Sequence, residues 1–370
     1  MRVPYSYLRE QFADSEPILR DIKGLLESTQ FTLGPPVAEF EERFARLCGA
    51  KHAIGVGTGT DALFLSLKAL GVGPGDEVIT AADTFIATAG AIVQAGARPV
   101  FVDVLDDFNI DPGRIEAAIT PRTKALLPVH YAGQPAKMGP ILEIARRHGL
   151  PVVEDACQAI SASIDGKLVS NFGVAAGFSL HPLKNLNVWG DGGVIVTNSS
   201  ELDATLRLLR NHGLRNRDEV EIFGYNCRLD SLQAIVGNHL IRDTEAITAA
   251  RIKNALALDA GLAPLAPRVR VPKRLPNERH VFHLYMFEAD DRDRLLAWLL
   301  EREIEAKIHY PVPLHLQPAG RRLGYREGDF PEAERQAKRI ITLPVHQHLS
   351  PAQVQFMIDS VTAFYRRPGA

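Results

Sequence analysis

Residues 177–198 read Gly177-Phe-Ser-Leu-His-Pro-Leu-Lys-Asn-Leu-Asn-Val-Trp-Gly-Asp-Gly-Gly-Val-Ile-Val-Thr-Asn198, and this stretch decides the fold. A short apolar strand is predicted to carry Ser179, because the proline of His181-Pro182 then stops regular structure. A second strand is predicted over residues 194–197. Lys184 therefore lies in a turn rich in Asn and Gly, between two buried strands.

A lysine in such a turn has two interpretations. Moving an ammonium group out of water is costly, so burial lowers its pKa and leaves a free amine that can form a Schiff base. Alternatively, Lys184 is an ordinary loop lysine at the end of a strand. The stretch alone leaves both interpretations open, and the residues upstream of it must decide.

Composition sets the broad class of the protein. The chain has 370 residues, 46% of them hydrophobic and 23% charged, which predicts one large domain and a smaller one. A net charge of -2 and a pI near 6.6 give no electrostatic footprint for nucleic acid or an anionic membrane. No signal peptide and no membrane-spanning run is predicted, so we expect a cytoplasmic protein.

Cysteine and histidine spacing argues against a metal site. Cys48, Cys157 and Cys227 are far apart, which disfavours a disulfide framework or a zinc site. The pair His346 and His348 has no carboxylate or cysteine partner in sequence, so we expect a solvated loop there and no metal.

The segment before residue 70 predicts a strand, a glycine-rich turn and a helix. The strand spans residues 52–56, the turn reads Gly57-Thr-Gly-Thr-Asp61, and the helix covers residues 62–70. This geometry directs backbone N–H groups at an anion. A tight turn with Thr60 or Asp61 as the helix N-cap explains it equally well.

The same alternation continues along the chain. Apolar and periodic segments predict strands over residues 77–80, 99–103, 124–129 and 150–155, and helices over residues 84–95, 112–119 and 141–148. Alternating strands and helices predict a mostly parallel sheet covered on both faces, with ligands beyond the carboxyl ends of the strands. Residues 57–61, Phe85, Asp155 and the Lys184 turn then share one edge.

Each of these residues is ambiguous alone. Asp155 is either the partner of a protonated pyridine nitrogen or a helix N-cap; Ser179 is a phosphate ligand or a small strand residue; Phe85 stacks on a flat cofactor or packs in the core. Together with Lys184 they describe a site for pyridoxal phosphate (PLP). Such a site needs a Schiff-base lysine, an acid for the ring nitrogen and a helix N-terminus for the phosphate.

The chain also resembles the DegT/StrS family of sugar aminotransferases, within the fold type I PLP enzymes. Blocks in family order run from about Gly34 to Pro344. They include Gly34-Pro-Pro-Val-Ala-Glu-Phe-Glu-Glu, Gly59-Thr-Asp-Ala-Leu, Thr84-Phe-Ile-Ala-Thr-Ala, Glu154-Asp-Ala-Cys-Gln-Ala, Ser179-Leu-His-Pro-Leu-Lys-Asn, Gly224-Tyr-Asn-Cys-Arg-Leu-Asp and His309-Tyr-Pro. The resemblance implies an α/β fold with a PLP-binding large domain, residues 1–248, whose first 33 residues form an arm. A smaller α+β domain, residues 249–370, is expected to follow, with a strand over residues 282–287, a helix over residues 292–301 and a frayed tail over residues 366–370.

The resemblance also implies roles by position. Lys184 would form the Schiff base and shuttle a proton, and Asp155 would keep the ring nitrogen protonated. The other expected cofactor contacts are Gly59, Thr60 and Ser179 at the phosphate, Phe85 on the ring, Gln158 at the ring hydroxyl and, from the neighbouring subunit of a homodimer, Asn226. The expected substrate contacts are Arg228, His309 and Tyr310.

The sequence thus predicts a PLP-dependent aminotransferase that moves the amino group of L-glutamate to a keto or aldehyde carbon of a sugar. The expected acceptor is a nucleotide-linked deoxy keto-sugar used for surface polysaccharide, including lipopolysaccharide. The form of the lysine loop also resembles 8-amino-3,8-dideoxy-octulosonate synthase, which makes 8-oxo-3-deoxy-octulosonate an alternative acceptor. A sugar dehydratase, in which histidine replaces the lysine, and a PLP-binding sensor are more distant alternatives. Two departures from the family, Ala81-Ala-Asp-Thr84 and Tyr131-Ala132, lie near the cofactor edge.

Overall fold

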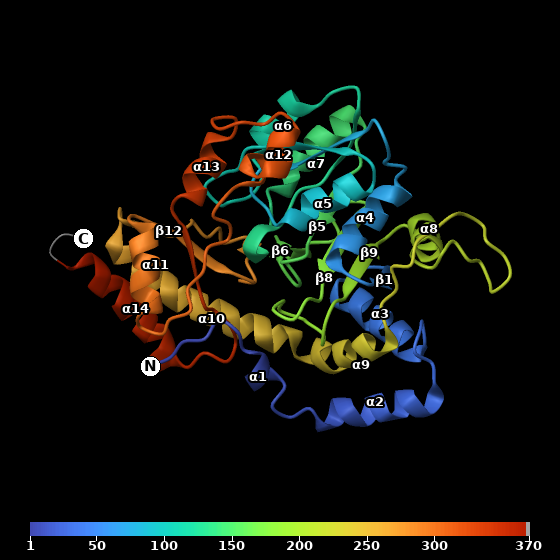
Figure 1. Cartoon of the computed structure of the whole chain (residues 1–370), viewed down its shortest axis with the longest axis horizontal. Helices are drawn as coiled ribbons and strands as arrows, with labels where there is room; N and C mark the ends of the chain where they lie inside the picture. The colour runs from blue at the N-terminus through green and yellow to red at the C-terminus, as the bar shows by residue number, and fades with distance from the viewer. Residues whose placement is uncertain (368–370) are drawn as a thin grey trace.

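The structure, a computed structural model, describes residues 1–367, so the end of the predicted frayed tail, residues 368–370, lies outside the described residues. Figure 1 shows the central sheet surrounded by helices, with α10 running beneath it toward a second sheet near the two termini. No helix in residues 1–367 combines the length and the apolar character needed to cross a membrane.

A seven-stranded sheet forms the centre of the molecule. One hydrogen-bonded set has the order β1 (His52–Val56), β9 (Gly193–Thr197), β8 (Ala175–Ser179), β5 (Val153–Asp155), and the other has the order β3 (Arg98–Val102), β2 (Glu77–Ala81), β4 (Thr123–Leu126). Parallel bridges from Leu126 to Val152 and from Val129 to Asp155 join the two sets. Within this sheet β9 runs antiparallel to both of its neighbours, and the paired neighbours β2–β3, β2–β4 and β5–β8 are parallel. The predicted mostly parallel sheet is confirmed.

Helices cover both faces of this sheet (Figure 1). On one side α4 (Gly59–Ala69) packs on β8 and contacts α5 (Ile86–Gln94) and α8 (Ser200–Arg210). On the other side α3 (Pro35–Leu47) packs on β1 and on α9 (Ser231–Leu240), and α2 (Glu16–Ser28) packs on α9. The remaining helices of this part are α1 (Leu8–Gln11), α6 (Pro112–Ala118) and α7 (Met138–His148).

The C-terminal part has its own antiparallel sheet, of order β10 (Val269–Arg270), β12 (Tyr285–Ala289), β13 (Ile340–Leu343). Its helices are α10 (Thr244–Leu262), α11 (Arg292–Leu300), α12 (Pro318–Arg322), α13 (Pro331–Ala337) and α14 (Pro351–Tyr365). A small third sheet joins β11 (Glu278–Arg279), β6 (Ser163–Ile164) and β7 (Lys167–Leu168). The predicted domain boundary at residue 248 falls inside α10, and the division into domains stays a prediction.

Two local predictions are wrong. The strand predicted over residues 282–287 begins only at Tyr285, because Phe282 has a left-handed φ of 47°, which no regular strand contains. His346 does not lie in a solvated loop: its ring is 4% exposed, and its Nε2 lies 3.0 Å from the carbonyl oxygen of Pro4.

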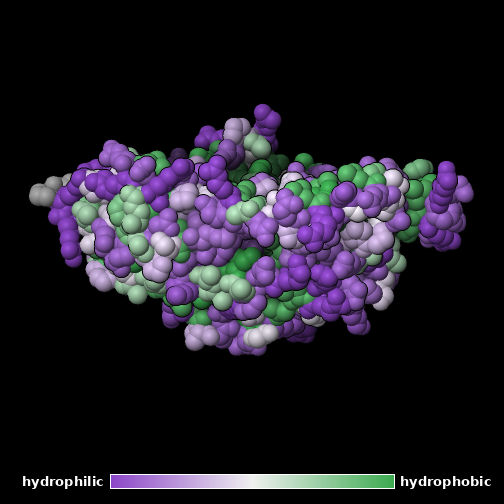
Figure 2. Space-filling model, turned by 90° about the horizontal axis from the view of Figure 1, so that it is seen from below, coloured by the Kyte–Doolittle hydropathy of each residue, from purple (hydrophilic) through white to green (hydrophobic). Residues whose placement is uncertain are grey.

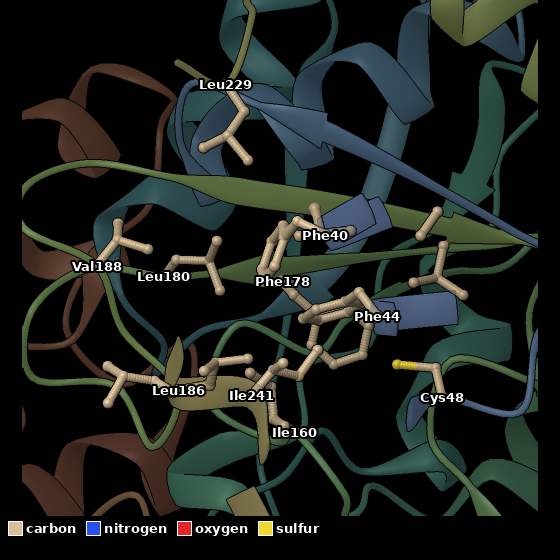
Figure 3. Close-up of a cluster of buried hydrophobic side chains, with 14 of the residues drawn as sticks. Phe40, Phe44, Cys48, Ile160, Phe178, Leu180, Leu186, Val188, Leu229 and Ile241 are labelled. Atoms are coloured by element: carbon tan, nitrogen blue, oxygen red, sulfur yellow. The ribbon is translucent and has the colours of Figure 1, made fainter. Parts of the chain in front are cut away.

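The loop after β8 is anchored in the hydrophobic core. Phe40 of α3 and Phe178 of β8 pack in one buried cluster, and Leu186 and Val188, both fully buried, extend from the loop into the same cluster (Figure 3). Apolar side chains on both sides of residue 184 therefore hold the turn rigidly against the sheet.

Candidate active site

A cavity of about 410 Å³ opens at the carboxyl ends of β5 and β8. It collects nine of the eleven residues predicted for the site, from elements spread over 250 positions of sequence. The nine are Gly59, Thr60, Phe85, Asp155, Gln158, Ser179, Lys184, His309 and Tyr310.

The N-terminus of α4 forms one end of the cavity. The helix begins at Gly59, and Thr58 is its N-cap, with its Oγ1 accepting a hydrogen bond from the Asp61 amide at 2.9 Å. The prediction of Thr60 or Asp61 as the cap was wrong because the helix starts three residues earlier than expected. The cap satisfies the Asp61 amide, so the Gly59 and Thr60 amides are the first-turn donors left to bind an anion.

Gly59 allows this helix end to come close to the loop after β8. A Cβ at position 59 would lie 2.7 Å from the Ser179 Cβ and 2.9 Å from the Cys157 Sγ. Only glycine fits there without displacing a neighbour. The Ser179 hydroxyl and the first-turn amides therefore face the same small space, which is the donor set that a phosphate group requires.

Asp155 ends β5 and is 4% exposed. Its Oδ2 accepts a 2.7 Å hydrogen bond from the Thr88 hydroxyl, and its Oδ1 accepts one from the Cys157 amide at 3.2 Å. Thr88 in turn lies 3.0 Å from Thr84, between their hydroxyl oxygens. These partners fix the carboxylate on the cavity wall, where a cationic ring nitrogen would pair with it.

Lys184 lies in the cavity opposite these groups. Its amide donates to the His181 carbonyl at 2.8 Å, and its carbonyl accepts from the Tyr7 hydroxyl at 2.9 Å and the Asn187 side-chain amide at 3.0 Å. Burial lowers the pKa of the Lys184 amine from its ordinary value, against the opposing charges of Cys157 and Asp155. This favours the Schiff-base interpretation over that of an ordinary loop lysine.

Aromatic and amide side chains form the walls. The Phe85 ring, 48% exposed, lies at the N-terminus of α5 with its centroid 5.9 Å from that of Tyr310. Gln158 lies on the cavity wall, and its Oε1 accepts a 2.6 Å hydrogen bond from the Ala132 amide. The Tyr131 hydroxyl donates to the His309 carbonyl at 2.8 Å and so steadies the irregular segment that carries Tyr310.

Three imidazoles around Lys184 are kept neutral. Burial lowers the pKa of His309 to about 4, and burial places the pKa of His283 well below its ordinary value. The pKa of His181 is lowered by burial and then by the Lys184 charge. At neutral pH these rings act as hydrogen-bonding groups and add no positive charge to the cavity.

Asn226 and Arg228 do not line this cavity. Asn226 is exposed, and its backbone forms an isolated antiparallel β-bridge with Asn211. The Arg228 guanidinium donates to the Asn211 side chain at 3.1 Å. Both residues belong to the segment that follows the loop projecting beyond α8 in Figure 1. Neither residue reaches the cavity of its own chain.

The structure adds residues that the sequence did not single out, among them Tyr5, Thr58, Thr84, His283 and Lys307 on the wall and Thr88 behind Asp155. Thr84 and Thr88 had a usable signal, because the predicted helix over residues 84–95 places positions four apart on one face, although α5 itself begins only at Ile86. No sequence signal indicated Tyr5, because its position depends on how the N-terminal segment folds back to the cavity. No group of three or more possible metal ligands occurs in the part of the chain that the structure describes.

Asp83 is buried beside the site without a partner. It is 1% exposed, neither carboxylate oxygen has a hydrogen-bond partner within residues 1–367, and burial raises its pKa to about 7. Because the unfolded value is near 3.8, wild-type stability is lost as pH rises between 4 and 7 and stays reduced above. We therefore expect Asp83→Asn to stabilise the protein by up to ~4 kcal/mol at pH 8 and little at pH 4.

Thermal unfolding of wild type and Asp83→Asn from pH 4 to pH 8 measures this difference. A gap in unfolding free energy that stays constant over this range would show that the Asp83 carboxyl does not titrate in the folded protein.

The residues of the cavity fit PLP. The first turn of α4 and Ser179 match its phosphate, Asp155 its ring nitrogen and Lys184 its aldehyde, and Phe85 has an open ring face at the mouth of the cavity.

Comparison with known proteins points in the same direction. The model of the DegT/DnrJ/EryC1/StrS aminotransferase family matches residues 13–362. The chain is 45% identical over 372 residues to the "Pleiotropic regulatory protein" of Geobacillus stearothermophilus, covering 99% of both chains. It is 42% identical over 347 residues to dTDP-3-amino-3,4,6-trideoxy-alpha-D-glucose transaminase of Streptomyces venezuelae, covering 94% of this chain and 91% of the relative.

A solved structure is similarly close. DesV of S. venezuelae, in complex with a ketimine intermediate, superposes with a TM-score of 0.96 at 41% identity and with 99% of each chain covered.

Proposed function

Because this chain belongs to the DegT/DnrJ/EryC1/StrS aminotransferase family and is a PLP-dependent sugar aminotransferase, we propose that it transfers the amino group of L-glutamate to a nucleotide-linked deoxy keto-sugar. The observation that carries this proposal is the single cavity in which the Lys184 amine, Asp155 and the N-terminus of α4 meet. The transaminase of Streptomyces venezuelae is named for a dTDP-linked sugar, and this supports a nucleotide-linked sugar as the acceptor.

Bound in this cavity, PLP supplies an electron sink for the pair released when the Cα–H bond of the amino donor breaks. The chain does the rest. Asp155 Oδ holds the proton on the ring nitrogen, and the Thr88 hydroxyl keeps that carboxylate oriented. Lys184 Nζ would take the proton from the donor Cα and deliver it to the cofactor carbon that takes up the amine, and in the second half-reaction it would move a proton from that carbon to the sugar carbon.

The remaining residues bind and orient. The α4 amides and the Ser179 hydroxyl would hold the phosphate, Gln158 would contact the ring hydroxyl and Phe85 would stack on the ring. His309 and Tyr310 line the same cavity and are the proposed substrate contacts. Burial lowers the pKa of Lys184 and so favours the unprotonated amine that nucleophilic attack requires.

The acceptor is tested in the second half-reaction, in which the enzyme first loaded with an amino group by glutamate passes that group on. The loaded enzyme is offered dTDP- and UDP-linked keto-sugars and 8-oxo-3-deoxy-octulosonate, and the return of the visible absorption of lysine-bound PLP is followed. We expect a nucleotide-linked sugar to restore it. Restoration by the octulosonate alone would support the alternative acceptor and contradict the nucleotide-sugar proposal.

We infer that the enzyme is a homodimer in which Asn226 reaches the phosphate site of the partner. The loop before Asn226 carries Phe223, 99% exposed, and Val220, 55% exposed, and projects to the right in Figure 1. Figure 2 shows hydrophobic and hydrophilic atoms together on this right-hand projection. A fully exposed phenylalanine at a loop tip is typical of an interface anchor.

Replacing Phe223 with aspartate is expected to shift the protein from dimer to the 40.6 kDa monomer and to weaken PLP binding by at least ~10-fold. Sedimentation velocity and PLP titration measure the two effects. Leu300→Asp, at a 50% exposed position on α11, is the matched control and should leave both unchanged. A wild-type protein that sediments as a monomer would contradict the dimer.

Cytoplasmic location and a role in lipopolysaccharide synthesis stay predictions from the sequence. The presence of Lys184 argues against the dehydratase alternative. The sensor alternative predicts that no amino acid converts the bound cofactor.

A further inference from the structure

The first 12 residues, which are the start of the predicted 33-residue arm and are called the N-terminal arm from here on, lie against the Lys184 turn. Within the loop, the Lys184 backbone is held by His181 and Asn187. The Tyr7 hydroxyl is the partner that comes from far away in sequence: it donates to the Lys184 carbonyl at 2.9 Å from 177 positions upstream. A hydrogen bond from the hydroxyl of a buried tyrosine fixes the position of the acceptor.

Tyr7 is itself firmly held. It is 2% exposed, and its ring lies 5.1 Å from the Arg251 guanidinium and 5.2 Å from the His346 ring. Arg251 is fully buried on α10, where its Nη1 donates to the Phe282 carbonyl at 3.1 Å. The hydroxyl that contacts Lys184 is thus carried by a ring clamped between α10 and the segment after β13.

Gln11 also connects the N-terminal arm to the Lys184 carbonyl. Gln11 donates its side-chain amide to Asn187 Oδ1 at 2.7 Å, and Asn187 donates to the Lys184 carbonyl. Gln347 donates to Gln11 at 2.9 Å. Two side chains of the arm, Tyr7 and Gln11, therefore converge on the same backbone carbonyl, one directly and one through Asn187.

The start of the arm is paired with the C-terminal part of the molecule. The Val3 amide donates to the Glu303 carbonyl at 2.9 Å, and the Glu305 amide donates to the Val3 carbonyl at 3.0 Å. The Tyr5 amide donates to the Glu305 carboxylate at 2.9 Å, and Tyr5 also lines the cavity. The arm thus runs from the C-terminal part, past the cavity, to the lysine turn.

We propose that Tyr7 is a positioning residue of the active site, whose hydroxyl sets the place of Lys184 relative to the cofactor, and that the N-terminal arm is a built part of that site. The proposal rests on the function proposed above. A displacement of about 1 Å at a reacting group is enough to cost ~10²-fold in rate, so the loss of one such bond has a kinetic effect beyond its effect on stability.

The test compares Tyr7→Phe with Tyr365→Phe. Both variants lose one buried hydroxyl that donates to a backbone carbonyl, since the Tyr365 hydroxyl donates to Asp290 at 2.6 Å far from the cavity. Two rates are measured in the dimeric holoenzyme and its apo form: conversion of bound PLP by L-glutamate, and the return of lysine-bound PLP absorption after PLP is added.

We expect Tyr7→Phe to slow both rates ~10-fold, with the dissociation constant for glutamate within about twofold of wild type. Tyr365→Phe should lose a similar few degrees of melting temperature and keep both rates. Wild-type rates in Tyr7→Phe, or equal slowing in both variants, would overturn the positioning role. If wild type itself ignores glutamate, the proposed function fails, and the rate of PLP attachment still decides the role of Tyr7.

Discussion

Lys184→Ala is expected to lower the rate of the glutamate half-reaction by ~10⁴-fold or more, because it removes both the amine that attaches the cofactor and the base that moves the Cα proton. The side chain lies in the cavity with an amine whose pKa is lowered by burial. The variant should also lack the visible absorption of lysine-bound PLP. Stopped-flow absorption after mixing with glutamate measures the rate directly.

Lys184→Arg distinguishes the positive charge of the side chain from its roles in Schiff-base formation and proton transfer. A guanidinium keeps the positive charge but stays protonated, so it can neither form the Schiff base nor accept the proton. We expect it to be as inactive as Lys184→Ala. Lys124→Ala, on the exposed side of β4, is the surface control and should react like wild type. Substantial activity in Lys184→Arg would show that another residue carries the proton.

Asp155→Asn is expected to lower the same rate by about 10²–10³-fold while leaving PLP bound. The amide is neutral and cannot hold a proton on the ring nitrogen, so electrons released at the donor Cα are less well accommodated. The hydrogen bonds from Thr88 and the Cys157 amide fix the orientation of this side chain in the wild type. Single-turnover kinetics at saturating glutamate isolates the effect from donor binding.

Thr88→Val provides the graded comparison, because it removes the 2.7 Å hydrogen bond and keeps the shape of the side chain. We expect a loss of roughly 10-fold, the cost of one charge-assisted hydrogen bond. If Asp155→Asn were no slower than Thr88→Val, the carboxylate charge would not matter, and the role of Asp155 would reduce to packing.

The sequence predicts the architecture of the N-terminal, cofactor-binding part well, because the strand and helix patterns that define it are local in sequence. Alternating strands and helices place residues 57–61, Asp155 and Lys184 at the same sheet edge, and the cavity lies there. The observed start of a helix differs from the predicted start where a capping residue determines it. Helix α4 starts at Gly59 because the Thr58 side chain accepts a hydrogen bond from the Asp61 amide. Hydrophobic periodicity carries no information about such a cap.

The rest of the site depends on contacts between distant segments. The contact between Tyr7 and Lys184 spans 177 positions, and nothing in residues 1–12 indicates which turn they will meet. Likewise, His346 and His348 look equally polar in sequence, yet His346 is buried against the arm. The family resemblance implied cofactor or substrate roles for Asn226 and Arg228, which lie outside the cavity of their own chain and require a partner chain to be judged.

The central claim is that Lys184 holds PLP in this cavity and that glutamate supplies the amino group. The most direct measurement is the absorption spectrum of the purified enzyme with PLP, recorded before and after L-glutamate is added without any acceptor. We expect the visible band of lysine-bound PLP to disappear in a single turnover and the pyridoxamine form to replace it. A band that L-glutamate, L-glutamine and other amino acids all leave unchanged would contradict the claim and favour a PLP-binding sensor.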